Sequence, residues 1–95
     1  MMRQEPRQAV RTIKLRIREN AFIESHFAHA AMIDQYIYDE DIQRAASNGR
    51  LLETRESASL GTCYVLQGYG MSEDPLVLVC RLLRRKVEIL DLYWA

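Results

Sequence analysis

Hydrophobic positions recur along the chain with two different periods, and the period changes near Gly49. Before Gly49, apolar residues return every three or four positions, which is the spacing of one helix face. After Gly49 they fall into short runs rich in β-branched residues, which is typical of strands. We therefore expect an α+β fold: two or three N-terminal helices within residues 4–50, packed on a three- to four-stranded antiparallel sheet within residues 51–94.

The first segment, residues 9–19, fits both periods. Val10, Ile13 and Ile17 follow helical spacing, while Ile13, Leu15 and Ile17 alternate with basic residues as they would in a strand. We predict a helix here, with a strand as the alternative.

Two further helices are expected before the period changes. Ser25 is a typical N-cap residue and begins a helix that runs to about Tyr36. Asp39 begins the second, and Gly49 is expected to end it in a left-handed conformation. The apolar positions are Phe27, Ala30, Ala31 and Ile33, with Met32 as a further candidate, in the first helix, and Ile42, Ala45 and Ala46 in the second.

Four β-rich segments follow, which read RLLETRE, TCYVLQGYG, LVLVCRLL and VEILDLYW. The third has almost no polar position, which predicts a central strand with Leu78 and Cys80 deeply buried. A shorter segment before the second helix, AFIES, fits either a strand or a connector. The length suits one domain over residues 1–95.

Composition restricts the class of protein more than its activity. Lys and Arg number 13 and Asp and Glu also 13, so the net charge is zero, whereas a general nucleic-acid binder normally carries a basic excess. Any RNA contact must therefore come from a local patch. No apolar run reaches the roughly 18 residues that span a bilayer, and no signal peptide is visible. We expect a cytoplasmic protein in which Cys63 and Cys80 are buried free thiols.

The only two histidines, His26 and His29, lie three residues apart at the start of a predicted helix and so share a face. Zinc needs three or four ligands, and the cysteines form no CxxC pair, so we predict neither a metal site nor another cofactor. We expect His26 to be exposed. His29 lies on or near the apolar stripe, where it is either a hydrogen-bonded core residue or an acid–base group.

A basic cluster surrounds one predicted turn between the last two strands. It is either a solvated hairpin tip or a phosphate-binding edge. Its members are Arg81, Arg84, Arg85 and Lys86, and the basic residues of the first segment could extend it.

The stretch HAAMIDQYIYDEDIQRAASNGRLLE, followed by GTCYVLQGYG, PLVLVCRL and VEILDLYW, resembles the bacterial domain-of-unknown-function family 4258 over about residues 9–94. The resemblance implies kinship with RelE-like and MqsR-like toxins, which are RNA endonucleases built as helices followed by an antiparallel sheet. It also implies a zinc-finger antitoxin protein as a partner. RNA and a second copy of the chain, in a homodimer, are the other partners we consider, and no membrane.

Residue by residue, the resemblance makes His29 the histidine of the family's His-Ala pair and Asp41 the acid of its Asp-Ile pair. Asn48-Gly49 and Glu53 match its Asn-Gly turn and following acid. The chain departs from the pattern near Val77, where members commonly have a second histidine. That departure weakens the case for RNA cleavage, because acid–base hydrolysis usually needs two proton-transfer groups.

These observations leave two hypotheses for function. The first is a toxin, or a toxin-derived component of a toxin–antitoxin pair, that cleaves RNA without metal. His29 would then be the base, Tyr93 a candidate second proton-transfer group, and the basic cluster at residues 81–86 the phosphate contact. The alternative is a non-catalytic protein-interaction module, which the neutral net charge and the absent second histidine favour.

Overall fold

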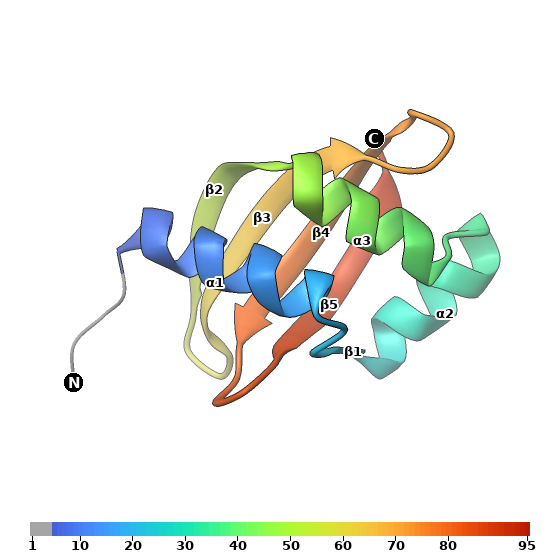
Figure 1. Ribbon diagram of the computed structural model, residues 1–95. Coiled ribbons are helices and arrows are strands. Elements are labelled where there is room, and N and C mark those ends of the chain that lie inside the picture. Colours follow the sequence, from blue (N-terminus) through green and yellow to red (C-terminus); the bar gives the residue numbers. More distant parts are fainter. Residues whose placement is uncertain (1–4) are drawn as a thin grey trace.

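The computed structural model describes residues 5–95, in which three helices lie on one face of a five-stranded sheet (Figure 1). The helices are α1 (Pro6–Arg18), α2 (His26–Gln35) and α3 (Asp39–Asn48). The strands are β1 (Phe22–Glu24), β2 (Arg50–Ser57), β3 (Gly61–Tyr69), β4 (Pro75–Leu82) and β5 (Val87–Trp94). None of the helices in this part of the chain is long and apolar enough to cross a membrane.

The sheet has the order β1-β5-β4-β3-β2, and strands β2 to β5 form the predicted antiparallel meander. The expected three- to four-stranded antiparallel sheet is corrected in one respect, because β1 adds a fifth strand parallel to β5. Phe22 lies opposite Val87, and Glu24 opposite Ile89. A strand of three residues is too short to show a period in its own sequence, and its partner residues 87–89 lie far along the chain.

Helix α1 settles the ambiguity of the first segment in favour of a helix. Ala9, Ile13 and Ile17 are fully buried, which is one stripe of a helix with Pro6 at its first position. Leu15, which only the strand period would bury, is 43% exposed.

Helix α2 begins as predicted, with Ser25 Oγ accepting a hydrogen bond from the Ala28 N–H at 3.0 Å. Its buried residues are Ala28 and Met32, however, while Phe27 and Ile33 are 69% and 65% exposed. The apolar stripe read from the sequence therefore does not face the sheet. The reason is that α2 is apolar on nearly all sides, so its pattern selects no single buried face.

Helix α3 buries Ile42, Ala45 and Ala46, as predicted. Gly49 follows it in an extended conformation, with φ −80° and ψ 164°, so the predicted left-handed end is wrong. The chain passes directly into β2, and an extended residue makes that connection.

Helix α3 lies unusually close to strand β3 at Gly68. A Cβ atom on Gly68 would lie 1.9 Å from the carbonyl oxygen of Ala45. The absence of a side chain thus lets the helix backbone rest on the strand.

The central strand β4 is buried as its sequence predicts, and Leu78 and Cys80 are fully buried. Cys63 and Cys80 are free thiols. Burial raises the pKa of the Cys80 thiol to about 12, which keeps it protonated and unreactive.

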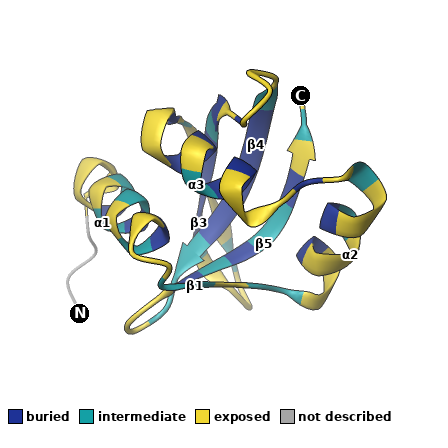
Figure 2. Ribbon diagram, turned by 45° about the vertical axis from the view of Figure 1, so that its right-hand side comes forward, coloured by how far each residue is buried: buried dark blue, intermediate teal, exposed yellow. Residues whose placement is uncertain are grey.

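The sheet face away from the helices carries a second, smaller apolar cluster. All three helices lie on the other side of the sheet (Figure 2). The cluster consists of Cys63, Val65, Val77 and Val79. Longer residues such as Arg55 and Tyr93 are their cross-strand partners.

We expect Gly68→Ala to lower the free energy of unfolding by about 1–3 kcal/mol, because the methyl group collides with the α3 backbone. Urea denaturation followed by circular dichroism measures this loss. Thr54→Ala, at an exposed position of β2, is the control and should change stability by less than about 0.5 kcal/mol. Equal effects of the two substitutions would contradict the close packing of α3 on β3.

Candidate protein-binding site

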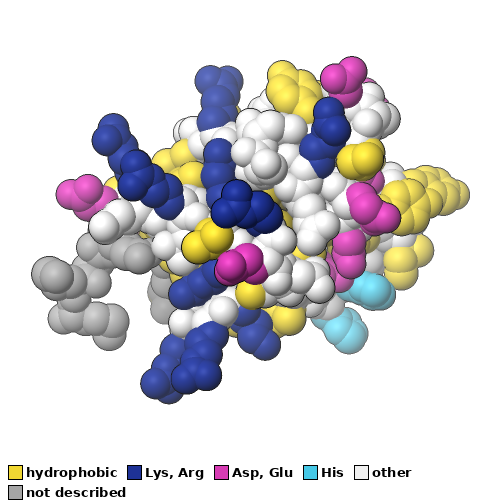
Figure 3. All heavy atoms as spheres, viewed as in Figure 1, with side chains coloured by type: hydrophobic (Ala, Val, Ile, Leu, Met, Phe, Trp, Pro, Cys, Tyr) yellow, Lys and Arg dark blue, Asp and Glu magenta, His cyan; other side chains and the backbone are white. Residues whose placement is uncertain are grey.

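Large apolar side chains are exposed around α2 and the connection to α3. The exposed fractions are 69% for Phe27, 65% for Ile33, 75% for Tyr36, 60% for Tyr38 and 57% for Met71. In Figure 3 hydrophobic side chains project at the end of the molecule that also carries the histidines and several acidic groups. Several large apolar side chains exposed at one end of a small protein indicate an interaction site.

One hollow in this surface, here called the apolar groove, has a volume of about 330 Å³ and runs along one flank of α2. Five of its six lining side chains are apolar or aromatic. The lining residues are His29, Met32, Ile33, Tyr36, Ile37 and Tyr38.

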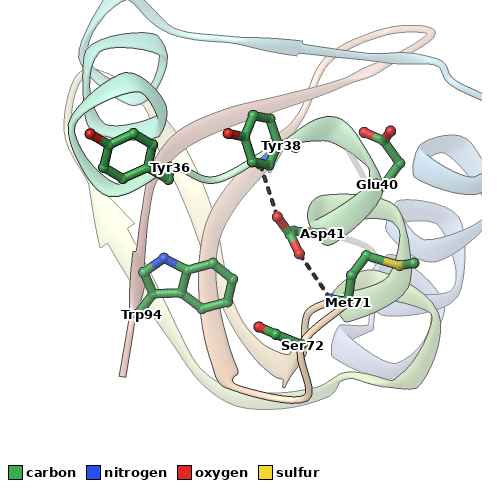
Figure 4. Close-up of a pocket in the computed structure, with 7 residues that line it drawn as sticks. All are labelled: Tyr36, Tyr38, Glu40, Asp41, Met71, Ser72 and Trp94. Carbon is green, nitrogen blue, oxygen red and sulfur yellow. Dashed lines mark hydrogen bonds between the residues drawn. The ribbon is translucent and has the colours of Figure 1, made fainter.

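A second hollow, here called the aromatic pocket, has a volume of about 350 Å³ (Figure 4). It adjoins the groove, because Tyr36 and Tyr38 line both. It lies where the α2–α3 connection, the start of α3, the β3–β4 turn and the end of β5 meet. The lining residues are Tyr36, Tyr38, Glu40, Asp41, Met71, Ser72 and Trp94.

Trp94 is fixed in the pocket by helix α2. Its indole Nε1–H donates to the Gln35 carbonyl oxygen at 2.9 Å, and its backbone N–H donates to Gln35 Oε1 at 3.3 Å. The Gln35 amide also donates to the Leu92 carbonyl at 3.4 Å. On the other side, a Cβ on Gly70 would lie 2.9 Å from both the indole ring and the Asp41 carboxylate, so glycine leaves room for them.

Asp41 is the one buried charged residue in the described part of the chain, at 6% exposure. Its Oδ2 accepts from the Tyr38 N–H at 3.0 Å, and its Oδ1 accepts from the Met71 N–H at 2.8 Å. Within residues 5–95 it has no Lys, Arg or His partner at ion-pair distance. Two backbone donors and the start of helix α3 therefore stabilise this carboxylate.

Tyr36 has a left-handed backbone conformation, with φ 55° and ψ 48°, at the end of α2. Glycine or asparagine is usual at such a position, and a bulky side chain there costs about 1–2 kcal/mol. The ring gains no burial in return, since it stands exposed between the groove and the pocket.

The two residues considered for proton transfer are not brought together. His29 lies on the groove flank of α2, 67% exposed, with its Nδ1 3.9 Å from Glu24 Oε1. It is thus not a core residue, and His26 is exposed as expected. Tyr93 lines a different hollow, on the opposite flank of α2, beside Phe27 and Asp34. Among residues 5–95, no three His, Cys, Asp or Glu side chains gather as a metal site would require.

The predicted basic cluster divides into two parts. Arg81 forms an ion pair with Glu88, with 2.6 Å between Nε and Oε1. The other members, Arg84, Arg85 and Lys86, are exposed at the β4–β5 turn.

Helix α1 joins this turn through Arg16. Its Nη1 donates to the Leu83 carbonyl at 2.9 Å and to the Lys86 carbonyl at 3.3 Å, and its Nη2 donates to the Arg84 carbonyl at 3.4 Å. Arg11, Lys14 and Arg18 line a hollow on the α3 side of the same helix. Most of the Lys and Arg side chains that Figure 3 shows lie over the α1 half of the molecule, away from the histidines. The basic surface is here defined as Arg11, Lys14, Arg18, Arg84, Arg85 and Lys86.

Sequence reasoning missed the aromatic pocket. The available signal was Tyr36-Ile37-Tyr38, a connector of aromatic and β-branched residues where turn residues are usual. In the structure Ile37 is 2% exposed and both tyrosines face outward.

Comparisons of the chain with protein-family models, curated proteins and solved structures find no match.

The pKa of Glu24 is raised, first because the carboxyl is partly buried and second because Asp39 lies nearby, while His29 opposes the shift. A carboxyl with a raised pKa in the folded state stabilises the fold while protonated. That contribution is lost as the pH rises through the folded-state pKa. We therefore expect Glu24→Gln to raise the melting temperature at neutral pH, with the gain shrinking toward acidic pH. Thermal melts across this pH range test the expectation, and a lower melting temperature at neutral pH would contradict it.

Proposed function

We propose that this chain is a protein-interaction module that binds a basic amphipathic helix of a partner in the apolar groove. The observation that supports this best is the exposure of Ile33, Tyr36, Tyr38 and Met71, each more than half exposed around two adjoining hollows. Leaving such side chains in water has a cost that binding removes, because a large apolar side chain gains about 1.5–3 kcal/mol on full burial.

The shape of the groove favours a helix as the occupant. Apolar side chains along one flank of α2 form a strip that can accept anchors spaced one helical turn apart on a partner. An added strand would need a free sheet edge here. The β5 edge beside α2 is instead occupied by Gln35 and by Ser25, whose Oγ donates to the Leu90 carbonyl at 2.9 Å.

The charged side chains around the groove indicate whether the partner segment is basic or acidic. Among residues 5–95, no Lys or Arg lines the groove or the aromatic pocket. Asp39 and Glu40 are exposed next to Tyr38, in the first turn of α3, and Glu40 lines the aromatic pocket. These carboxylates would therefore attract basic residues that flank the apolar anchors of a partner, and they would repel acidic residues.

The test is calorimetric titration of the chain with a synthetic amphipathic peptide of leucine and lysine, against the equivalent peptide of leucine and glutamate. We expect the basic peptide alone to bind. Ile33→Ser should weaken binding at least about tenfold, the loss of roughly 1.4 kcal/mol. The melting temperature should not change, because Ile33 is exposed.

Leu52→Ser is the matched control, since Leu52 is an exposed apolar residue on β2, 45% exposed, away from the groove. Equal binding of the two peptides, or undiminished binding by Ile33→Ser, would contradict the proposal. Sedimentation of the chain alone supplies a further check. A dimer that Ile33→Ser dissociates would make the occupant a second copy, against the proposal.

A second candidate function is a RelE-like toxin that acts on RNA with a zinc-finger antitoxin as its partner. The observations that favour it are the order of helices before an antiparallel meander and the basic surface on both sides of α1. Arg84, Arg85 and Lys86 would contact phosphate in this proposal. His29 would remain the candidate base. Tyr93, the second candidate for proton transfer, lies on the opposite flank of α2, so the two would not contact one phosphate together.

Expression of the chain without any partner tests this second proposal, with growth arrest and RNA cleavage as readouts. His29→Gln should abolish both and leave the melting temperature unchanged, because the ring is largely exposed. Joint replacement of Arg84, Arg85 and Lys86 by alanine should reduce the salt dependence of single-stranded RNA binding, by about 0.7 in slope for each lost phosphate contact. The second proposal would be refuted if the unchanged chain caused no growth arrest and showed no salt-dependent binding of RNA.

A further inference from the structure

We infer that the aromatic pocket is a receptor for an organic cation, an ammonium or guanidinium group carried on an alkyl chain. The inference rests on the proposed function and deepens it, because it names the group with which a basic partner would anchor itself. The same chemistry is available in a lysine or arginine side chain and in a free quaternary ammonium compound.

Three aromatic rings supply the walls of the pocket. Tyr36 and Tyr38 come from the α2–α3 connection, and Trp94 comes from the end of β5. Figure 4 shows the two phenol rings and the indole around one space. Aromatic faces carry negative potential, so a cation enclosed by several of them is attracted without needing a hydrogen bond from each.

Two carboxylates give the pocket its negative sign. Asp41 lies at the floor, buried, with one backbone N–H on each oxygen and no basic partner among residues 5–95. Each carboxylate oxygen can accept more than one hydrogen bond, so both keep capacity for a bound donor. Glu40 is exposed at the mouth. An anion would be repelled here, and a neutral apolar anchor would bring no charge to the buried carboxylate.

The pocket is already formed before a ligand enters. Gln35 fixes the indole, Gly70 gives it room, and Asp41 holds the backbone of Tyr38 and Met71. Tyr36 is held exposed by a left-handed backbone that a bulky residue adopts only at a cost. Binding therefore does not have to order the indole ring or the backbone that carries Tyr38 and Met71, which lowers the cost of binding a small cation.

Trp94 is the single tryptophan of the chain, so its fluorescence reports on this pocket alone. Titration with choline and with its uncharged counterpart 3,3-dimethylbutanol isolates the effect of the charge. We expect choline to change the fluorescence saturably, with at least about tenfold higher affinity than the alcohol. Butylammonium and butylguanidinium then separate the sources: tighter binding of these two points to a partner side chain, and tighter binding of choline to a free quaternary ammonium compound.

Tyr36→Asn is the most informative variant, because asparagine suits the left-handed backbone while the ring is lost. It should reduce cation affinity at least about tenfold with an unchanged or raised melting temperature. Glu40→Gln should also lower the affinity for the cation, and Leu52→Ser on β2 should leave it unchanged. An alcohol that binds as tightly as choline, or full cation affinity in Tyr36→Asn, would overturn the inference.

Two further outcomes keep this inference and the proposed function distinguishable. If the leucine–lysine peptide binds, Ile33→Ser weakens that binding and no alkyl cation binds, the cation receptor is refuted and the interaction module stands. If alkyl cations bind and the peptide does not, the interaction module is refuted and the cation receptor stands.

Discussion

A buried carboxylate, bonded to two backbone N–H groups from different parts of the chain, holds together the surface that we assign to binding. Asp41 joins the first turn of α3, through Tyr38, to the β3–β4 turn, through Met71. Both ends of this bridge line the aromatic pocket. Without the carboxylate, two donors would lose their acceptors in a partly buried place, at about 1–3 kcal/mol each, and the turn would lose its fixed position beside the helix.

Although the net charge of the chain is zero, its basic side chains and its exposed apolar and acidic side chains lie at different ends of the molecule. Basic groups gather around α1 and the β4–β5 turn, while apolar, aromatic and acidic groups gather around α2 and the start of α3 (Figure 3). Each end can thus contact a different class of partner. The interaction module that we propose uses the α2 end alone. The RelE-like alternative would use both ends, with RNA phosphates on the basic surface and the candidate base His29 at α2.

The parts of the fold that the sequence predicts are those with a local period. The helix at α1, the buried face of α3, the Ser25 cap and the burial of Leu78 and Cys80 all follow from spacing within one element. Strand β1 and the exposed side of α2 do not, because the first is too short to show a period and the second is apolar on nearly all sides. The pocket depends on contacts between distant residues, such as Trp94 with Gln35 and Asp41 with Met71, and no window of the sequence contains both partners. The same limit applies to Arg81. The sequence shows that it is basic, but its ion pair with Glu88 follows from the register of β4 and β5, which the sequence does not give.

The location of peptide binding tests the central claim most directly, and amide chemical-shift mapping on the isotope-labelled chain measures it. On addition of the leucine–lysine peptide, we predict that the largest changes fall on α2, on residues 36–41, on the turn at 70–72 and on the Trp94 indole N–H. Changes concentrated instead on α1 and residues 83–86, or along the free edge of β2, would contradict the assignment of the groove and pocket as the binding site.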